Sequence, residues 1–216
     1  MAGRREPPRA VAFVDGQNLY HAARRCFAYV LPNFDVLCLS QVVCASRGWE
    51  LGEVRFYTSV RRPSDEPFWC NLWAAKLAAM GREGVRVYAR PLVYRRVKLR
   101  TPEGVEFAFL ARQEKGIDVR IALDIVRMAH RREYDVALVF SQDQDLSEVA
   151  KEIRTIAREQ RRWIKIASAY PEGGTGRGRC GIERTDWIPI DRKTYDACID
   201  PHDYRPRSPM NPGGGS

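Results

Sequence analysis

Residue types that commonly bind zinc are scarce or scattered in this 216-residue chain. Its three histidines, His21, His130 and His202, show no zinc-like spacing with any cysteine. The six cysteines include no Cys-x-x-Cys pair, and four of them fall at expected apolar helix positions: Cys26, Cys38, Cys44 and Cys70. We therefore expect neither a zinc site nor a disulfide framework, but the reduced, structural cysteines of a cytoplasmic protein.

Long apolar runs are also absent. None approaches the ~20 residues that span a bilayer, and no apolar segment near the N-terminus has the pattern of a secretory signal. The Gly-rich stretch 173–181 lacks the Gly-Lys-Ser/Thr ending of a phosphate-binding P-loop. These absences argue against a membrane protein, an exported protein and a P-loop nucleotide hydrolase.

The sequence instead shows apolar strands that alternate with amphipathic helices. We expect strands at residues 10–14, 54–60, 85–90, 136–140 and 164–170. We expect helices at about 17–26, 35–48, 66–83, 115–131, 146–157 and 191–199. Between the third strand and its following helix, residues 97–110 predict an inserted β-hairpin with a turn at Pro102-Glu-Gly104. The pattern predicts one α/β domain with a parallel sheet over residues 9–200, a flexible segment 1–8 and a disordered tail 201–216.

Two carboxylates, Asp143 and Asp145, lie just past the end of the apolar strand 136–140. Asp145 alone can serve as the N-cap of the next helix, and such a pair also occurs in ordinary turns. Two carboxylates two residues apart, however, repel each other unless they share a cation. Carboxylate oxygens at this position suit a hard divalent ion such as Mg²⁺ or Mn²⁺.

Two further acidic positions can join this pair. Asp15 and Asn18 follow the strand 10–14, and they converge on Asp143 if the two strands are neighbours, although Asp15 also suits a plain turn or cap. Asp118 lies in the first turn of a helix, where the helix dipole alone stabilises a carboxylate. Asp124 does not lie on the same helix face as Asp118, because six residues rotate a helix by about 240° beyond a full turn. We therefore expect Asp124 to be a surface or supporting residue.

Three motifs together resemble one known family. Phe-Val-Asp-Gly-Gln-Asn-Leu (13–19), Lys-Gly-Ile-Asp-Val (115–119) and Ser-Gln-Asp-Gln-Asp-Leu (141–146) resemble the NYN domain of the PIN-like nuclease superfamily, whose relatives include LabA-like proteins. The resemblance covers roughly residues 9–190. It implies a Rossmannoid three-layer α/β/α sandwich with a central parallel sheet of order 3-2-1-4-5, and a metal-dependent ribonuclease site.

The resemblance also implies residue roles. It assigns Asp15, Asp118, Asp143 and Asp145 to a cluster that holds one or two Mg²⁺ or Mn²⁺ ions. Asn18 would orient a ligand, water or substrate, and Lys115 would contact phosphate. The ions would lower the pKa of a bound water, and hydrolysis would leave 5′-phosphate and 3′-hydroxyl ends.

The chain departs from the family pattern at a few positions. Gln142 and Gln144 stand where many relatives carry glycine or another small residue, Leu146 replaces a more usual phenylalanine, and residues 186–190 match the closing motif only loosely. A catalytically silent RNA-binding or scaffolding module is therefore the alternative. A Toprim nuclease is disfavoured because it needs Glu where this chain has Asp15, and a nucleotide-sugar transferase because no nucleotide loop is recognisable.

The charge balance favours a nucleic-acid partner. The chain has 36 basic and 27 acidic residues, a formal net charge of +9, and a basic surface attracts phosphate backbones. The expected RNA contacts beyond the cluster lie on the hairpin, at Arg95, Arg96, Lys98 and Arg100, and in the Gly-rich loop, at Arg177 and Arg179. Charges that protect an edge hairpin from aggregation explain the first group equally well. An aromatic face on helix 66–83 can serve a homodimer.

Overall fold

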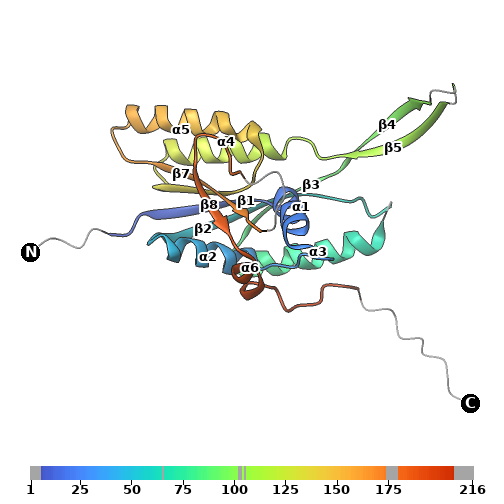
Figure 1. The fold of residues 1–216 in the computed structure, drawn as a ribbon, viewed down its shortest axis with the longest axis horizontal. Helices are drawn as coiled ribbons and strands as arrows, with labels where there is room; N and C mark the ends of the chain where they lie inside the picture. The colour runs from blue at the N-terminus through green and yellow to red at the C-terminus, as the bar shows by residue number, and fades with distance from the viewer. Residues whose placement is uncertain (1–5, 65, 102–103, 105, 174–179, 207–216) are drawn as a thin grey trace, which may run out of the picture.

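A six-stranded parallel sheet lies at the centre of the computed structural model, which describes residues 6–64, 66–101, 104, 106–173 and 180–206 (Figure 1). Its order is β3-β2-β1-β6-β7-β8. The strands are β1 (Arg9–Asp15), β2 (Glu50–Val60), β3 (Arg86–Pro91), β6 (Val136–Phe140), β7 (Lys165–Pro171) and β8 (Asp186–Ile190). The five predicted strands lie in the predicted order. The sixth strand, β8, is an addition, and its Pro189 is tolerated because β8 is an edge strand.

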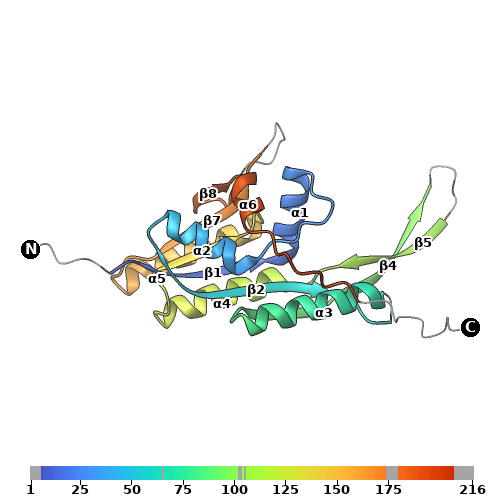
Figure 2. The ribbon, with the colours of Figure 1, turned by 90° about the horizontal axis from the view of Figure 1, so that it is seen from below.

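Helices cover both faces of the sheet and confirm the three-layer α/β/α sandwich (Figures 1 and 2). One layer contains α1 (Gly16–Phe27), α2 (Val36–Ser46), α3 (Pro67–Arg82) and the short α6 (Arg192–Ala197); the other contains α4 (Ile117–His130) and α5 (Ser147–Glu159). Side chains of β1 alternate between the two cores: Ala10, Ala12 and Val14 face the first, and Val11 and Phe13 face the second. Within the described ranges, no helix is long and apolar enough to cross a membrane.

The inserted hairpin is longer than the sequence predicts. Its strands, β4 (Val93–Arg100) and β5 (Glu106–Gln113), pair antiparallel as a separate two-stranded sheet that projects from the body of the protein (Figures 1 and 2). Pairing begins at Val93↔Gln113, outside the predicted range 97–110. Because Tyr94, Arg95 and Arg96 carry no apolar alternation, periodicity alone does not extend the strand to the base of the hairpin.

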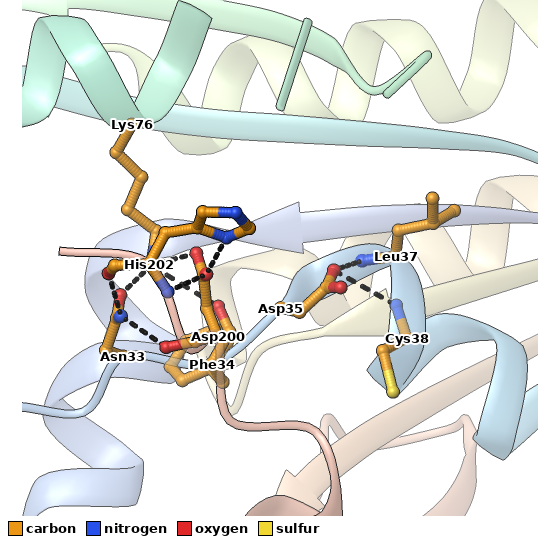
Figure 3. Close-up of polar contacts among 8 residues, drawn as sticks. All are labelled: Asn33, Phe34, Asp35, Leu37, Cys38, Lys76, Asp200 and His202. Atoms are coloured by element: carbon orange, nitrogen blue, oxygen red, sulfur yellow. Dashed lines mark hydrogen bonds and ion pairs between the residues drawn. The ribbon is translucent and has the colours of Figure 1, made fainter. Parts of the chain in front are cut away.

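Contacts with α2 and α3 attach the chain that follows α6 (Figure 3). The backbone N–H of Asp200 donates to the Asn33 carbonyl oxygen at 2.8 Å. The buried ammonium of Lys76 donates to Asn33 Oδ1 and lies 3.9 Å from Asp200 Oδ2. The Sγ atoms of Cys38 and Cys198, both free thiols, lie 2.6 Å apart. This segment therefore packs as part of the first helical layer.

Candidate metal centre

The predicted acidic residues lie at the carboxyl ends of the parallel strands, where the central strands β1 and β6 end side by side. The two strands pair in parallel, with Val14 opposite Phe140, so the residues that follow them meet. Asp15 is the last residue of β1, and Ser141, Gln142 and Asp143 follow β6. Asp118 reaches the same region from the first turn of α4. The predicted adjacency of the two strands is confirmed.

Asp15 both caps a helix and belongs to the acidic cluster. Its Oδ1 accepts from the backbone N–H of Asn18 at 3.0 Å, which caps α1, and its Oδ2 accepts from Ser141 Oγ at 3.2 Å. The side chain is 3% exposed. Burial, together with the charges of Asp118 and Asp143 and against the opposing hydrogen bonds from Asn18 and Ser141, raises the pKa of Asp15 to about 6. The cap and the cluster are thus two roles of one residue.

The turn at Gly16 has no room for a side chain. A Cβ there would lie 2.5 Å from the ring of Phe56 and 2.9 Å from the carbonyl oxygen of Tyr57. Glycine therefore allows α1 to start directly after Asp15, close against β2.

Asp143, rather than Asp145, caps the segment after β6. Its Oδ1 accepts from the backbone N–H of Asp145 at 3.0 Å and starts the 3₁₀ turn η1 (Gln144–Leu146). The alternative in which Asp145 only caps the next helix does not hold, because η1 intervenes and α5 begins only at Ser147. Asp145 is exposed. Burial raises the pKa of Asp118, and the charges of Asp143 and then Asp145 act in the same direction.

Glu114 is an acidic neighbour that the sequence motifs did not identify. It lies between the end of β5 and the start of α4. Burial, together with the charges of Asp15 and Asp118 and against hydrogen bonds from Ser59, raises the pKa of Glu114 to about 7. Within the described residues, no donor reaches the buried Oε2 atom. Its only sequence signal is its place directly before Lys115, at the start of the second motif.

The two glutamines that depart from the family pattern hold the acidic loop in place. The backbone N–H of Gln142 donates to Asn18 Oδ1 at 3.0 Å, and its side chain donates to the carbonyl oxygen of Cys180 at 2.9 Å. The side-chain amide of Gln144 donates to Gly181 O at 3.1 Å and accepts from Glu183 N at 3.0 Å. The loop after β6 is therefore tied to α1 on one side and to residues 180–183 on the other.

The candidate ligands suit a hard cation that keeps part of its water shell better than a cation surrounded by protein ligands. All candidate ligands are carboxylates, which suit Mg²⁺ or Mn²⁺. In the parts of the chain that the structure describes, no group of three His, Cys, Asp or Glu side chains is close enough to enclose an ion. Mg²⁺ commonly keeps several waters and takes one or two carboxylates plus substrate phosphates. Asp15, Asp118 and Asp143, with Glu114 and Asp145 beside them, match that mode of binding.

The structure describes some, but not all, of the basic residues that the sequence suggests as phosphate or RNA contacts. Lys115 is exposed next to Glu114, and the side chains of Arg95, Arg96, Lys98 and Arg100 are exposed on β4. Arg177 and Arg179 lie outside the described residues.

Asp124 is not a surface residue. It is 3% exposed and accepts from Tyr57 Oη at 2.9 Å, with Arg120 and Arg127 nitrogens each 3.0 Å from its Oδ1. This paired network joins α4 to β2 and is separate from the cluster.

Replacing Asp15 by asparagine is expected to stabilise the metal-free protein at pH 8. Because the pKa of Asp15 is higher in the folded than in the unfolded chain, the folded state binds the proton more tightly, and stability is lost as pH rises from 3.8 to about 6. That rise corresponds to about 3 kcal/mol, which asparagine avoids while its Oδ1 still accepts from Asn18. Urea unfolding in EDTA measures the gain, which should disappear towards pH 4. Equal stability of variant and wild type at pH 8 would contradict this account.

Comparison with known proteins gives one family match. The sequence model of a family described as the NYN domain matches residues 9–172. A solved protein of unknown function from Vibrio parahaemolyticus has a similar fold, with a TM-score of 0.53 and 20% identity over 88% of this chain and 96% of that chain. A deacetylase of teicoplanin biosynthesis (TM-score 0.29, 12% identity, 73% of this chain and 68% of that chain) and Acinetobacter baumannii MurG (0.31, 8%, 85% and 45%) are far less similar. No curated protein matches the sequence.

Proposed function

The chain belongs to the NYN domain family, and from this premise we propose that it is a metal-dependent ribonuclease that hydrolyses RNA phosphodiester bonds. The observation that carries the proposal is that Asp15 and Asp143, which follow the paired strands β1 and β6, converge with Asp118 in the first turn of α4. Mutual repulsion of carboxylates is a cost that a bound cation relieves, and pKa shifts of this kind are common at functional sites.

The residues of the cluster have distinct proposed tasks. A divalent ion, when bound, supplies a water of lowered pKa and positive charge beside the scissile phosphate. Asp118, Asp143 and Asp145 are the proposed ligands that remain open to the substrate side, and Asp15 holds the buried side of the site. Asn18 positions the loop through Gln142 N. Lys115 is exposed beside the cluster and is the proposed phosphate contact.

The net charge of +9 supports RNA as the substrate. Arg95, Arg96, Lys98 and Arg100 are the proposed contacts on the hairpin, with Arg177 and Arg179 in the Gly-rich loop. The products are proposed to carry 5′-phosphate and 3′-hydroxyl ends, and the protein is proposed to act in the cytoplasm. A homodimer through the α3 face that carries Phe68, which is 45% exposed, is a secondary proposal.

One observation favours the alternative of a silent RNA-binding module. Among the described residues no three candidate ligands are close enough to enclose an ion. The hydrogen bonds made by Gln142 and Gln144 favour the ribonuclease instead, since they support the loop that carries Asp143.

The experiment that distinguishes the ribonuclease from the silent module is an incubation of the purified full chain with end-labelled single-stranded and structured RNA. Mg²⁺, Mn²⁺ and EDTA are compared in parallel. Cleavage that requires the metal supports the ribonuclease, and the product ladder reports whether cleavage is internal or from an end. Salt-sensitive RNA binding without any cleavage supports the silent module instead.

A further inference from the structure

The projecting hairpin β4–β5, called the arm below, has two chemically different faces. Directly opposed residues of an antiparallel pair lie on the same face, and Leu99 pairs with Phe107 while Val97 pairs with Phe109. Phe107, Phe109 and Leu99 are 47%, 46% and 46% exposed. A two-stranded hairpin is only marginally stable alone in water, and an apolar face that half-exposes two phenylalanines is open to a partner.

The other face of the arm is basic. Arg96, Lys98 and Arg100 alternate with the apolar residues along β4 and are all exposed. Arginine and lysine side chains neutralise phosphates without regard to sequence. The charge of the arm therefore complements a nucleic acid.

The aromatic spacing on β5 is the spacing of a base-stacking strand. Phe107 and Phe109 lie two residues apart on one face, with the small Ala108 between them, followed by Leu110. The order aromatic, small, aromatic, aliphatic also occurs in the RNP1 strand of RNA-recognition motifs, where aromatic rings stack on unpaired bases. The likeness is confined to this short stretch, and the arm has two strands rather than four.

The arm also connects directly to the acidic cluster. β5 ends at Gln113, and the next two residues are Glu114, which interacts with Asp15 and Asp118, and Lys115. We propose that the arm binds unpaired RNA, with bases stacked on Phe107 and Phe109 and phosphates neutralised by its basic residues, and so leads a single strand to the cluster. This inference rests on the proposed function and specifies its substrate as single-stranded.

A second copy of the chain is a poorer occupant of the same face. Two half-exposed phenylalanines and one leucine offer roughly 300 Å² per copy, whereas a stable interface needs about 800 Å² from each partner. Two arms would also bring together Arg96, Lys98 and Arg100 of both copies, within chains that each carry a net charge of +9. Area and charge both favour RNA.

The test is a binding titration in EDTA, which separates binding from cleavage. A fluorescently labelled unpaired 12-mer RNA and a duplex of the same sequence are titrated with the full-length wild type, with Phe107→Ala/Phe109→Ala, and with Trp163→Ala. Trp163 is a matched control, since it is 54% exposed and precedes β7, at the amino ends of the parallel strands and so away from the cluster. The double variant is expected to weaken binding of the unpaired RNA by about 10- to 100-fold, with duplex binding unchanged and Trp163→Ala within about twofold of wild type.

Each outcome is decisive for the arm. Unchanged binding of the unpaired RNA by the double variant overturns the proposal, whether or not the wild type cleaves RNA. An equal loss on duplex and unpaired RNA also overturns it, as does a dimer in light scattering that the double variant dissociates, because the face would then be a protein interface. Restored binding in Phe107→Tyr/Phe109→Tyr, whose rings still stack, supports it. If the double variant loses binding of the unpaired RNA but the wild type never cleaves RNA, the nuclease proposal fails while the arm assignment stands.

Discussion

Replacing Asp143 by asparagine is expected to lower metal-dependent RNA cleavage by at least about 10²-fold. Even residues that only support a metal ligand typically cost 10- to 100-fold when mutated, so a direct ligand should cost no less. The fold should survive, because asparagine Oδ1 can still accept from the backbone N–H of Asp145 and keep η1 in place. Initial rates on end-labelled RNA, together with the thermal midpoint, measure the two effects separately.

Asp186→Asn is the matched control for this substitution. Asp186 starts β8, at the sheet edge opposite the cluster, and its exposed carboxylate pairs with Lys165. Its loss should leave cleavage within about twofold of wild type, because exposed ion pairs contribute little. Full activity in Asp143→Asn would exclude this carboxylate from the reaction and remove the main support for the ribonuclease.

Replacing Glu114 by glutamine is expected to lower cleavage by about 10²-fold at limiting Mn²⁺. Glutamine keeps the shape of the side chain but removes a negative charge that interacts with Asp15 and Asp118. If Glu114 helps to hold the cation, more Mn²⁺ will be needed to reach half of the maximal rate, and Mn²⁺ will raise the thermal midpoint less than in the wild type.

Glu159→Gln provides the control, since Glu159 is exposed at the last residue of α5, away from the loop that carries Asp143. It removes one negative charge without touching the cluster. An unaltered Mn²⁺ dependence in Glu114→Gln would show that Glu114 is a buried structural carboxylate, and the cluster would then consist of the four aspartates alone.

The cluster itself was largely predictable. Asp15 and Asp143 each follow a run of apolar residues, and a buried strand needs such a run to cover both of its faces. Once the two strands are neighbours, the residues after them meet without further information. The departures at Gln142 and Gln144 were visible as well, but their effect was not, because their partners are some 40 positions away, at residues 180–183.

The surroundings of two acidic residues, Glu114 and Asp124, could not be read from the sequence. The acidity of Glu114 and the pairing of Asp124 depend on which side chains approach them from other elements, and periodicity carries no such information. The same holds for the cap: Asp143 and Asp145 are equally good capping residues by type, and only the 3₁₀ turn decides between them.

The sequence by itself determined the alternation of strands and helices and the positions of the four aspartates, because local apolar patterns suffice for these. The order of the five predicted strands followed from the resemblance to the NYN family. Only the tertiary structure decided that β8 completes the sheet, that Glu114 joins the cluster and that the arm separates an aromatic face from a basic one. Each of these depends on pairing or burial between residues distant in sequence, and burial is what sets the pKa of a carboxylate and the exposure of a ring.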